Sequence, residues 1–253
     1  MKDIIEVENL TKVYSSFKGT KEVTALDGIS LTAKKGEFIG VMGPSGSGKT
    51  TLLNILSGVD AATSGTVSIE GHNIVKMKRD ELALFRRQRI GYIFQDFNLL
   101  DSLTLKENIA LPMILDKKTP QEIEKRVDEL MKFFGITELA SKYQYHISGG
   151  QRQRVAAARA LSTDPAVCFA DEPTGNLDSK SAAGIMEMLT QMNEQKDCTI
   201  LMVTHDAFAA SYCKRIIFIK DGKVSAQIQR AVDRKSFFDK ILEVLSVMGG
   251  DSQ

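Results

Sequence analysis

A glycine-rich stretch near the start of the chain has residue types suited to binding a chain of phosphates. It runs Gly43-Pro44-Ser45-Gly46-Ser47-Gly48-Lys49-Thr50 and fits the template G-x-x-x-x-G-K-[S/T] at every fixed position. Glycines let the backbone turn its N–H groups inward, and a helix beginning here adds partial positive charge. Lys49 is then expected to reach the β- and γ-phosphates of a triphosphate, and the Thr50 hydroxyl to bind Mg²⁺.

The residues on either side of this stretch predict a strand–loop–helix unit. Residues 37–42 form an apolar run typical of a buried strand, and residues 51–56 have helical spacing with Gly58 after them. This is the geometry that a triphosphate requires, whereas a glycine-rich turn with an accidental lysine would not need such flanks. The sequence therefore predicts a nucleotide-binding protein.

Acidic residues and a histidine follow two further apolar runs. Residues 166–170 end at Asp171 and Glu172, and residues 199–203 end at Thr204-His205. In proteins with such a phosphate loop, an aspartate here binds Mg²⁺ directly or through water, and an adjacent glutamate can polarise water for attack on the γ-phosphate. We expect His205 to contact the γ-phosphate, because strand ends face the ligand in this fold. The alternatives are a solvated acidic turn and a structural histidine.

A second glycine-rich turn precedes another predicted helix. It runs Ile147-Ser148-Gly149-Gly150-Gln151 and is followed by Arg152-Gln153-Arg154-Val155-Ala156, which provides a second anion-binding helix N-terminus. One nucleotide does not need two complete phosphate cradles on one chain. Two chains facing head to tail would place each cradle across the nucleotide of the other chain.

With these motifs in their order, nearly the whole chain resembles the ATPase subunit of an ABC transporter. The resemblance implies ATP and Mg²⁺ as ligands, with Ile147 standing where leucine is commoner. It implies that Tyr14 stacks on adenine, although strand-edge packing is an alternative, and that Gln95 links Mg²⁺ and water to the membrane partner, although a surface polar role is an alternative. Residues 175–178 correspond to the D-loop.

The resemblance also assigns the site residues by role. Those implied to be catalytic are Glu172 as the base, His205 as the switch histidine, and Gln95. Those implied to bind the metal are Thr50, Gln95 and Asp171. Those implied to bind nucleotide are Tyr14, the eight residues Gly43 to Thr50, Thr51, and, from the second chain, Ser148, Gly149, Gly150 and Gln151.

Less specific sequence similarities indicate a subgroup of the ABC transporter ATPases. Residues 171–178 resemble the ATPases serving lipoprotein release, macrolide export and cell-division permeases. Within that group, residues 94–100, 209–213, 218–222 and the tail around 236–238 resemble the Bce-type ATPases, which act against peptide antibiotics such as bacitracin or nisin. The implied partners are a second copy in a homodimer, an integral membrane permease and a membrane sensor histidine kinase. The implied location is cytoplasmic, on the inner face of the cell membrane through the permease.

A soluble ABC protein acting on ribosomes or DNA is the competing function. Ribosome-acting members resemble two tandem ATPase units, whereas this chain has one phosphate loop and one signature. DNA-repair members separate their halves by a long coiled coil, and no sustained heptads occur here. A net charge of +1 also disfavours nucleic acid, so no nucleic-acid partner is expected.

These motifs require elements that position them, and the pattern predicts an α/β fold with a P-loop NTPase core, an antiparallel β-subdomain and a helical insert. Residues 1–94 and 149–226 are predicted to form the core with the β-subdomain, residues 95–148 the helical subdomain, and residues 227–253 a C-terminal helical extension. The whole chain, 1–253, would be one nucleotide-binding domain. The predicted strands cover residues 4–10, which residues 11–14 follow, then 23–33, 37–42, 65–71, 89–94, 166–170 and 199–203, with a hairpin of 215–220 and 223–227. Residues 15–21 are predicted to form a polar connection.

The insert is predicted to begin with a helix over 103–115 that Pro112 ends or distorts. A second helix begins at Thr119 with a capping box completed by Glu122 and ends at Gly135. Further helices are predicted over 179–194 and 237–248. Between Gln95 and the first helix, Phe97, Leu99 and Leu100 either fold back into the core of the insert or line a groove for a permease helix.

The composition fits a soluble globular chain. Of 253 residues, 43% are hydrophobic and 26% are charged. No run approaches the roughly 18 apolar residues that span a bilayer, and a signal-peptide pattern is absent. Cys168, Cys198 and Cys213 are an odd number without CxxC spacing, so we expect reduced core thiols.

Overall fold

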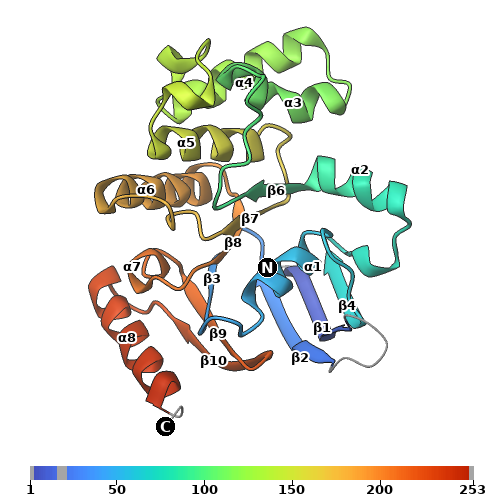
Figure 1. The fold of residues 1–253 in the computed structure, drawn as a ribbon, viewed down its shortest axis with the longest axis vertical. Helices are drawn as coiled ribbons and strands as arrows, with labels where there is room; N and C mark the ends of the chain where they lie inside the picture. The colour runs from blue at the N-terminus through green and yellow to red at the C-terminus, as the bar shows by residue number, and fades with distance from the viewer. Residues whose placement is uncertain (1–2, 16–21, 251–253) are drawn as a thin grey trace.

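The computed structural model describes residues 3–15 and 22–250, and it contains two β-sheets. The larger sheet has five parallel strands and one antiparallel strand at its edge, β10 (Figure 1). In spatial order its strands are β10 (Lys223–Gln229), β9 (Arg215–Lys220), β3 (Phe38–Met42), β8 (Thr199–Val203), β7 (Val167–Asp171) and β6 (Ile90–Ile93). Of the predicted connection over residues 15–21, residues 16–21 lie outside the described residues.

Register within this sheet brings the ends of its central strands together. Val203 of β8 pairs with Val41 of β3 on one side and with Asp171 of β7 on the other. Because parallel strands share one carboxyl edge, the phosphate loop, the acidic pair and the Thr204-His205 turn leave the sheet side by side. The topology therefore brings the three predicted strand-end motifs to one edge.

The smaller sheet is wholly antiparallel. Its strands are, in spatial order, β2 (Val23–Lys34), β1 (Asp3–Tyr14), β4 (Ser64–Ile69) and β5 (His72–Asn73). Alternating residues of β1 such as Ile5 and Val7 are buried. They form one core with α1 (Lys49–Leu56) and with Ile39 and Val41 of β3. Thus α1 is packed between the two sheets, and the predicted β-subdomain is present.

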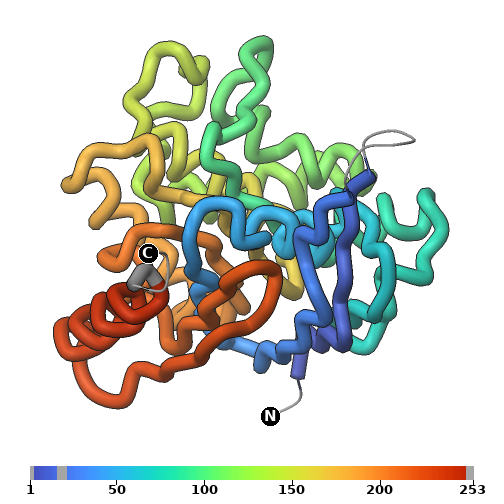
Figure 2. Tube along the Cα trace, turned by 60° about the horizontal axis from the view of Figure 1, so that its bottom comes forward, coloured from blue at the N-terminus to red at the C-terminus, as the bar shows by residue number. Residues whose placement is uncertain are grey.

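The opposite face of the larger sheet forms a second core. Phe38 and Met42, which alternate with Ile39 and Val41 along β3, belong to it. The helices on this side are α5 (Gly149–Ala160), α6 (Ser179–Gln195), α7 (Ala207–Ala210) and α8 (Arg234–Gly250). The three cysteines are buried and free, as predicted. Figure 2 shows the green and yellow insert and the red α8 at opposite ends of the molecule.

The insert consists of α3 (Leu105–Leu115), α4 (Pro120–Phe133) and short 3₁₀ turns at Thr137–Leu139 and Gln144–His146. The predicted capping box of Thr119 and Glu122 is present. The helix over 103–115 does not end at Pro112 but continues through it. A proline inside a helix removes one hydrogen bond, and the burial of Leu105, Ile109 and Met113 along α3 offsets that loss.

Sequence patterns missed α2 (Arg79–Arg89), which follows a 3₁₀ turn at Ile74–Lys76. Its sequence is dominated by charged residues, and Phe85 is its one buried side chain. α2 gives only a short periodic signal, from Leu82 and Phe85, which lie one turn apart and pack against the core of the smaller sheet. It is joined to the insert instead by polar contacts, since Arg87 donates to the carbonyl of Leu115 at 2.6 Å and Gln88 donates to Asp116 at 2.7 Å.

Candidate nucleotide site

The phosphate loop connects β3 to α1, and two of its glycines have no room for a side chain. A Cβ at Gly43 would lie 2.0 Å from the carbonyl oxygen of Ile219. A Cβ at Gly48 would lie 2.4 Å from the carbonyl oxygen of Ala25, and its φ of +102° also favours glycine. Gly46 has a φ of +77° but open space around its Cβ position. The loop is thus pressed against two strands on one side and open at its tip.

The loop presents unused donors at its open side. No side chain caps α1, so its first-turn N–H groups have no intrahelical partner. Ser47 Oγ is buried, and no partner for it occurs among residues 3–15 and 22–250. Lys49 Nζ folds over the loop and donates to the carbonyls of Gly43 and Pro44, each at 2.9 Å. Burial lowers the pKa of Lys49, and the negative charges of Glu172 and Asp171 oppose that shift. These donors suit an anion.

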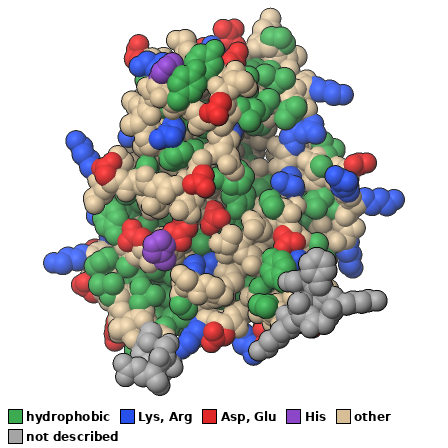
Figure 3. Space-filling model, in the orientation of Figure 1, with side chains coloured by type: hydrophobic (Ala, Val, Ile, Leu, Met, Phe, Trp, Pro, Cys, Tyr) green, Lys and Arg blue, Asp and Glu red, His purple; other side chains and the backbone are tan. Residues whose placement is uncertain are grey.

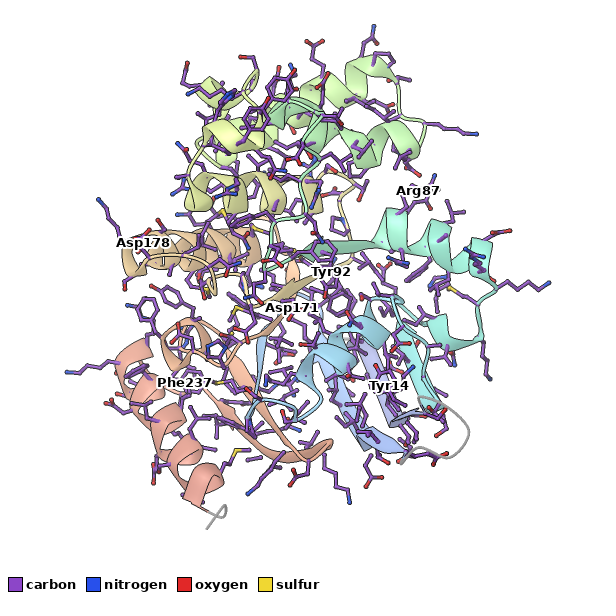
Figure 4. All side chains as sticks on the ribbon, in the orientation of Figure 1. Tyr14, Arg87, Tyr92, Asp171, Asp178 and Phe237 are labelled. Carbon is purple, nitrogen blue, oxygen red and sulfur yellow. The ribbon has the colours of Figure 1, made fainter. Side chains whose placement is uncertain are left out.

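Asp171 lies at the end of β7 with one oxygen that needs a ligand. Its Oδ1 is buried and has no hydrogen-bond partner within the described part of the chain. Burial raises the pKa of Asp171, and the charge of Glu172 adds to this, whereas a hydrogen bond from Tyr92 and the charge of Lys49 lower it. An orphaned carboxylate oxygen fits a hard divalent cation. Figure 4 shows Asp171 and Tyr92 close together at the middle of the molecule.

Few protein ligands surround that position. Within the described ranges, no group of three or more His, Cys, Asp or Glu side chains could hold a metal ion. Mg²⁺ ordinarily uses one or two carboxylates together with phosphate oxygens and water. The orphaned oxygen of Asp171 therefore fits Mg²⁺ brought in with a nucleotide, and Thr50 and Gln95 remain the predicted further ligands.

Tyr92 was not predicted as a site residue. It lies on β6, and its hydroxyl is 3.4 Å from Asn54 Oδ1 on α1. Burial and the charge of Asp171 raise the pKa of Tyr92, so the phenol stays protonated. Nothing in the sequence indicates this contact, because it depends on β6 pairing with β7.

Glu172 and His205 meet at the carboxyl edge of the sheet. His205 Nδ1 lies 2.8 Å from Glu172 Oε1. The side chain of Glu172 is 17% exposed and that of His205 is 71% exposed, so the pair opens toward solvent. Glu172 has a φ of +46°, and its N–H donates to the carbonyl of Val203 at 2.9 Å. A left-handed glutamate costs of the order of 1 kcal/mol, and such strain is concentrated at functional sites.

Gln95 leaves β6 next to this edge, since Ile93 of β6 pairs with Ala170 of β7. The Asn176 amide donates to the backbone carbonyl of Gln95 at 3.3 Å and to Asp96 Oδ1 at 2.9 Å. A Cβ at Gly175 would lie 3.1 Å from Gln95 Nε2. Residues 95–96 and 175–176 therefore touch in the folded chain.

The second glycine-rich turn lies apart from the phosphate loop. Ser148 caps α5, accepting from the Gln151 N–H at 3.3 Å, while Gln151 Oε1 accepts from the Ser148 N–H at 3.0 Å. A cleft of about 530 Å³ opens beside it and is lined in part by Gly150, Asp178 and Ser181. In Figure 1, α5 lies near the insert, whereas the phosphate loop lies between β3 and α1 in the lower layer. One chain does not bring the two cradles together.

Tyr14 ends β1 and belongs to a polar cluster that sequence reasoning did not foresee. Its hydroxyl donates to Asp60 Oδ2 at 2.7 Å, and Lys12 Nζ lies 4.6 Å from its ring centroid. Burial opposes ionisation of Asp60, but hydrogen bonds from Lys12 and Tyr14 outweigh it and leave the pKa of Asp60 below its usual range. With 41% of its surface exposed, Tyr14 has area left for another ring.

Comparisons with known proteins agree with this geometry. A family model described as ABC transporter matches residues 26–175. The bacitracin export ATP-binding protein BceA of Halalkalibacterium halodurans is 47% identical over 98% of this chain and 97% of its own. The lipoprotein-releasing system ATP-binding protein LolD 1 of Rhodopseudomonas palustris is 41% identical over 89% of this chain and all of its own. A dimeric structure of the ATP-binding cassette MJ0796 bound to ADP and Pi has a TM-score of 0.81, with 40% identity over 90% of this chain and 100% of that one.

Proposed function

This chain belongs to the ABC transporter ATPases, and on that premise we propose that two copies hydrolyse ATP head to tail to drive a membrane permease that protects against peptide antibiotics. The membership confirms the predicted ABC ATPase fold and the predicted ATP-hydrolysing activity. One observation supports the proposed site most directly. The phosphate loop, Asp171 and the Glu172–His205 pair leave one parallel sheet at one edge.

In the proposed site, ATP takes up the donors that the loop leaves unused. Phosphate oxygens would accept from the first-turn N–H groups of α1 and from Lys49, which would exchange two carbonyl partners for them. Tyr14 would stack on the adenine. Thr50, Asp171 and Gln95 would hold Mg²⁺, which when bound neutralises phosphate charge.

Glu172 would accept the proton of the attacking water. Its left-handed backbone, held by the bond to Val203, would direct the carboxylate toward the γ-phosphate. His205 would orient that carboxylate through Nδ1 and contact the γ-phosphate with its exposed ring. A positioned general base contributes about 10²–10⁴-fold to rate.

The test of this assignment separates binding from hydrolysis. Glu172→Gln keeps the side-chain shape, so ATP should still bind while turnover falls by about 10²–10⁴-fold. Lys49→Ala removes a cation from the phosphates, so it should weaken ATP binding itself. The measurements are the ATP turnover and the nucleotide affinity of the two full-length variants. Wild-type-like turnover by Glu172→Gln would refute the role of Glu172 as the general base.

The dimer would complete each site with the partner's Ser148 turn. This is supported by the separation of the two cradles within one chain, and the MJ0796 cassette is described as dimeric. Mixing Lys49→Ala chains with Ser148→Arg chains yields heterodimers with one intact composite site. Recovery of partial activity is expected, whereas normal hydrolysis by dilute Ser148→Arg monomers would contradict the composite site.

The permease would dock over a surface that includes the exposed Leu100 and a cleft of about 340 Å³ between α2, β6 and the insert, which Asn98 of the same segment lines. Its lining combines Arg86, Arg87 and Arg159 with Phe94 and Pro112. A short amphipathic permease helix with acidic residues would complement both parts. No helix within residues 3–15 and 22–250 is long and apolar enough to cross a membrane. We place the chain on the inner face of the cell membrane through the permease.

The peptide-antibiotic role is supported by the similarity to BceA, and a sensor histidine kinase would belong to the same complex. Basic and acidic side chains are interspersed on the face in Figure 3, which gives no support to a nucleic-acid partner. Co-expression of this chain with the permease that it serves should raise resistance to bacitracin or nisin, and Glu172→Gln should abolish that gain. A defect in lipoprotein release or macrolide export instead would favour those relatives' activities.

A further inference from the structure

Three side chains of α5 contact residues 94–98, the segment that follows β6 and contains Gln95. The Arg152 guanidinium lies 4.9 Å from the ring centroid of Phe97. Gln153 Nε2 donates to the carbonyl of Phe94 at 3.4 Å. Arg159 donates to two successive carbonyls, to Phe97 at 2.8 Å and to Asn98. The helix that begins at the second glycine-rich turn thus contacts the loop that contains Gln95.

Two residues of this segment have an unfavourable left-handed backbone conformation. Phe97 has a φ of +62° and Asn98 a φ of +48°, and neither is glycine. A left-handed backbone is unfavourable for both residues, although asparagine tolerates this conformation better than phenylalanine does. Such a conformation persists only where the surroundings hold it. Arg159 is bonded to the carbonyls of both residues.

The environment of Arg159 strengthens these bonds. Its side chain is only partly exposed, and this burial lowers the pKa of Arg159, which stays charged. In a partly buried position, a charged donor binds carbonyl oxygens more strongly than it does when fully exposed. The planar fork also reaches two adjacent carbonyls at once, which a lysine ammonium does less well.

We propose that Arg159 is a positioning residue, which holds the Gln95 loop in its left-handed conformation and joins it through α5 to the Ser148 turn. The distance along α5 from Ser148 to Arg159 is eleven residues, or about 16 Å of rigid helix. One end would sense the metal side of the chain's own ATP, and the other would present Ser148 to the partner's ATP. This inference rests on the proposed function and adds a residue that couples the two sites.

The experiment measures the Mg²⁺ requirement of the full-length chain. In Arg159→Met the Gln95 loop loses its anchor, so the Mg²⁺ concentration for half-maximal ATPase activity should rise by about tenfold, equivalent to ~1.4 kcal/mol. ATP affinity measured in EDTA should stay within about twofold of wild type, because it depends on the phosphate loop rather than on Gln95. In a Gln95→Ala background, the same Arg159→Met change should alter the Mg²⁺ requirement by less than about twofold.

Two further variants separate positioning from simple structural support. Arg126→Met is the matched control, because Arg126 donates to the carbonyl of Leu161 at 2.9 Å and to Asp164 but not to the Gln95 loop; its Mg²⁺ requirement should stay unchanged. Asn98→Gly relieves the left-handed strain, so it should partly restore Arg159→Met. If Arg159→Met does not fold, Arg159→Lys gives the same readouts with a smaller shift.

The outcomes distinguish the two proposals. A wild-type chain without Mg²⁺-dependent ATP hydrolysis would overturn the proposed function. An active wild type whose Mg²⁺ curve coincides with that of Arg159→Met or Arg159→Lys would overturn the positioning role alone. An equal effect in the Gln95→Ala background would do the same.

Discussion

Leu99 and Leu100 are neighbours in sequence with opposite environments, so alanine at each position separates packing from docking. Leu99 is 7% exposed and belongs to the core of the insert, whereas Leu100 is 45% exposed. Truncating a buried leucine costs about 2–5 kcal/mol, whereas truncation at an exposed position stays within about 0.5 kcal/mol. For a chain of this size, each kcal/mol moves the melting temperature by about 2–4 °C. Taking ~3 kcal/mol, Leu99→Ala should lower it by about 6–12 °C.

Thermal unfolding of both full-length variants without nucleotide measures this difference, and co-purification with the permease measures docking. Leu100→Ala should melt within about 2 °C of wild type. It should keep its ATPase activity and bind the permease less well, because Leu100 is exposed in the segment that follows Gln95. Equal melting of the two variants would refute the division between core and surface. Normal permease binding by Leu100→Ala would place the docking surface elsewhere on the insert.

Three other perturbations have defined outcomes. Gly48→Ala should abolish ATP binding, because its Cβ would lie 2.4 Å from the Ala25 carbonyl. Gly46→Ala has open space but a left-handed φ of +77°, so it should weaken ATP binding less than Gly48→Ala does. Equal affinities of the two variants by calorimetry would contradict the close approach at Gly48. Asn108 is fully buried and forms hydrogen bonds with backbone groups of residues 100, 103 and 104. Asn108→Leu should therefore lower the free energy of unfolding, measured by urea titration, by about 2–4 kcal/mol. An unchanged urea midpoint would show that these hydrogen bonds do not stabilise the fold. The pKa of Asp60 is lower in the folded chain than in the unfolded chain, so ionised Asp60 stabilises the fold at pH values above the ordinary carboxyl pKa. This stabilisation is lost as the pH falls through the pKa of Asp60 in the folded chain. Asp60→Asn should therefore have a lower melting temperature than wild type at pH 7, and the two melting temperatures should converge in acid. A difference in melting temperature that does not change with pH would contradict this reasoning.

Prediction from sequence succeeded where the determining information is local. The phosphate loop is fixed by its glycines and its flanking strand and helix, and the capping box of Thr119 depends on residues three apart. The strands ending at Asp171 and Thr204 were visible as apolar runs. Their meeting at one edge then follows from parallel pairing, which those runs imply.

Prediction failed where a residue depends on partners far along the chain. The sequence could not choose between core and groove for residues 97–100, and the fold buries Phe97 and Leu99 while exposing Leu100. It missed α2, whose apolar signal is limited to a few residues among charged ones, and it left open whether Pro112 ends or distorts α3, which in fact continues through Pro112.

The sequence by itself determined the chemistry available to this chain: a glycine loop, an acidic pair, a histidine and a second anion-binding turn, each encoded within a few adjacent residues. Only the tertiary structure decided which side chains hold those motifs in place. Tyr92 approaches Asp171, Asn176 bonds Asp96, and Arg159 bonds the Phe97 carbonyl, over sequence separations of 60 to 80 residues. Such contacts are set by strand order and helix packing rather than by periodicity, so no local pattern reports them.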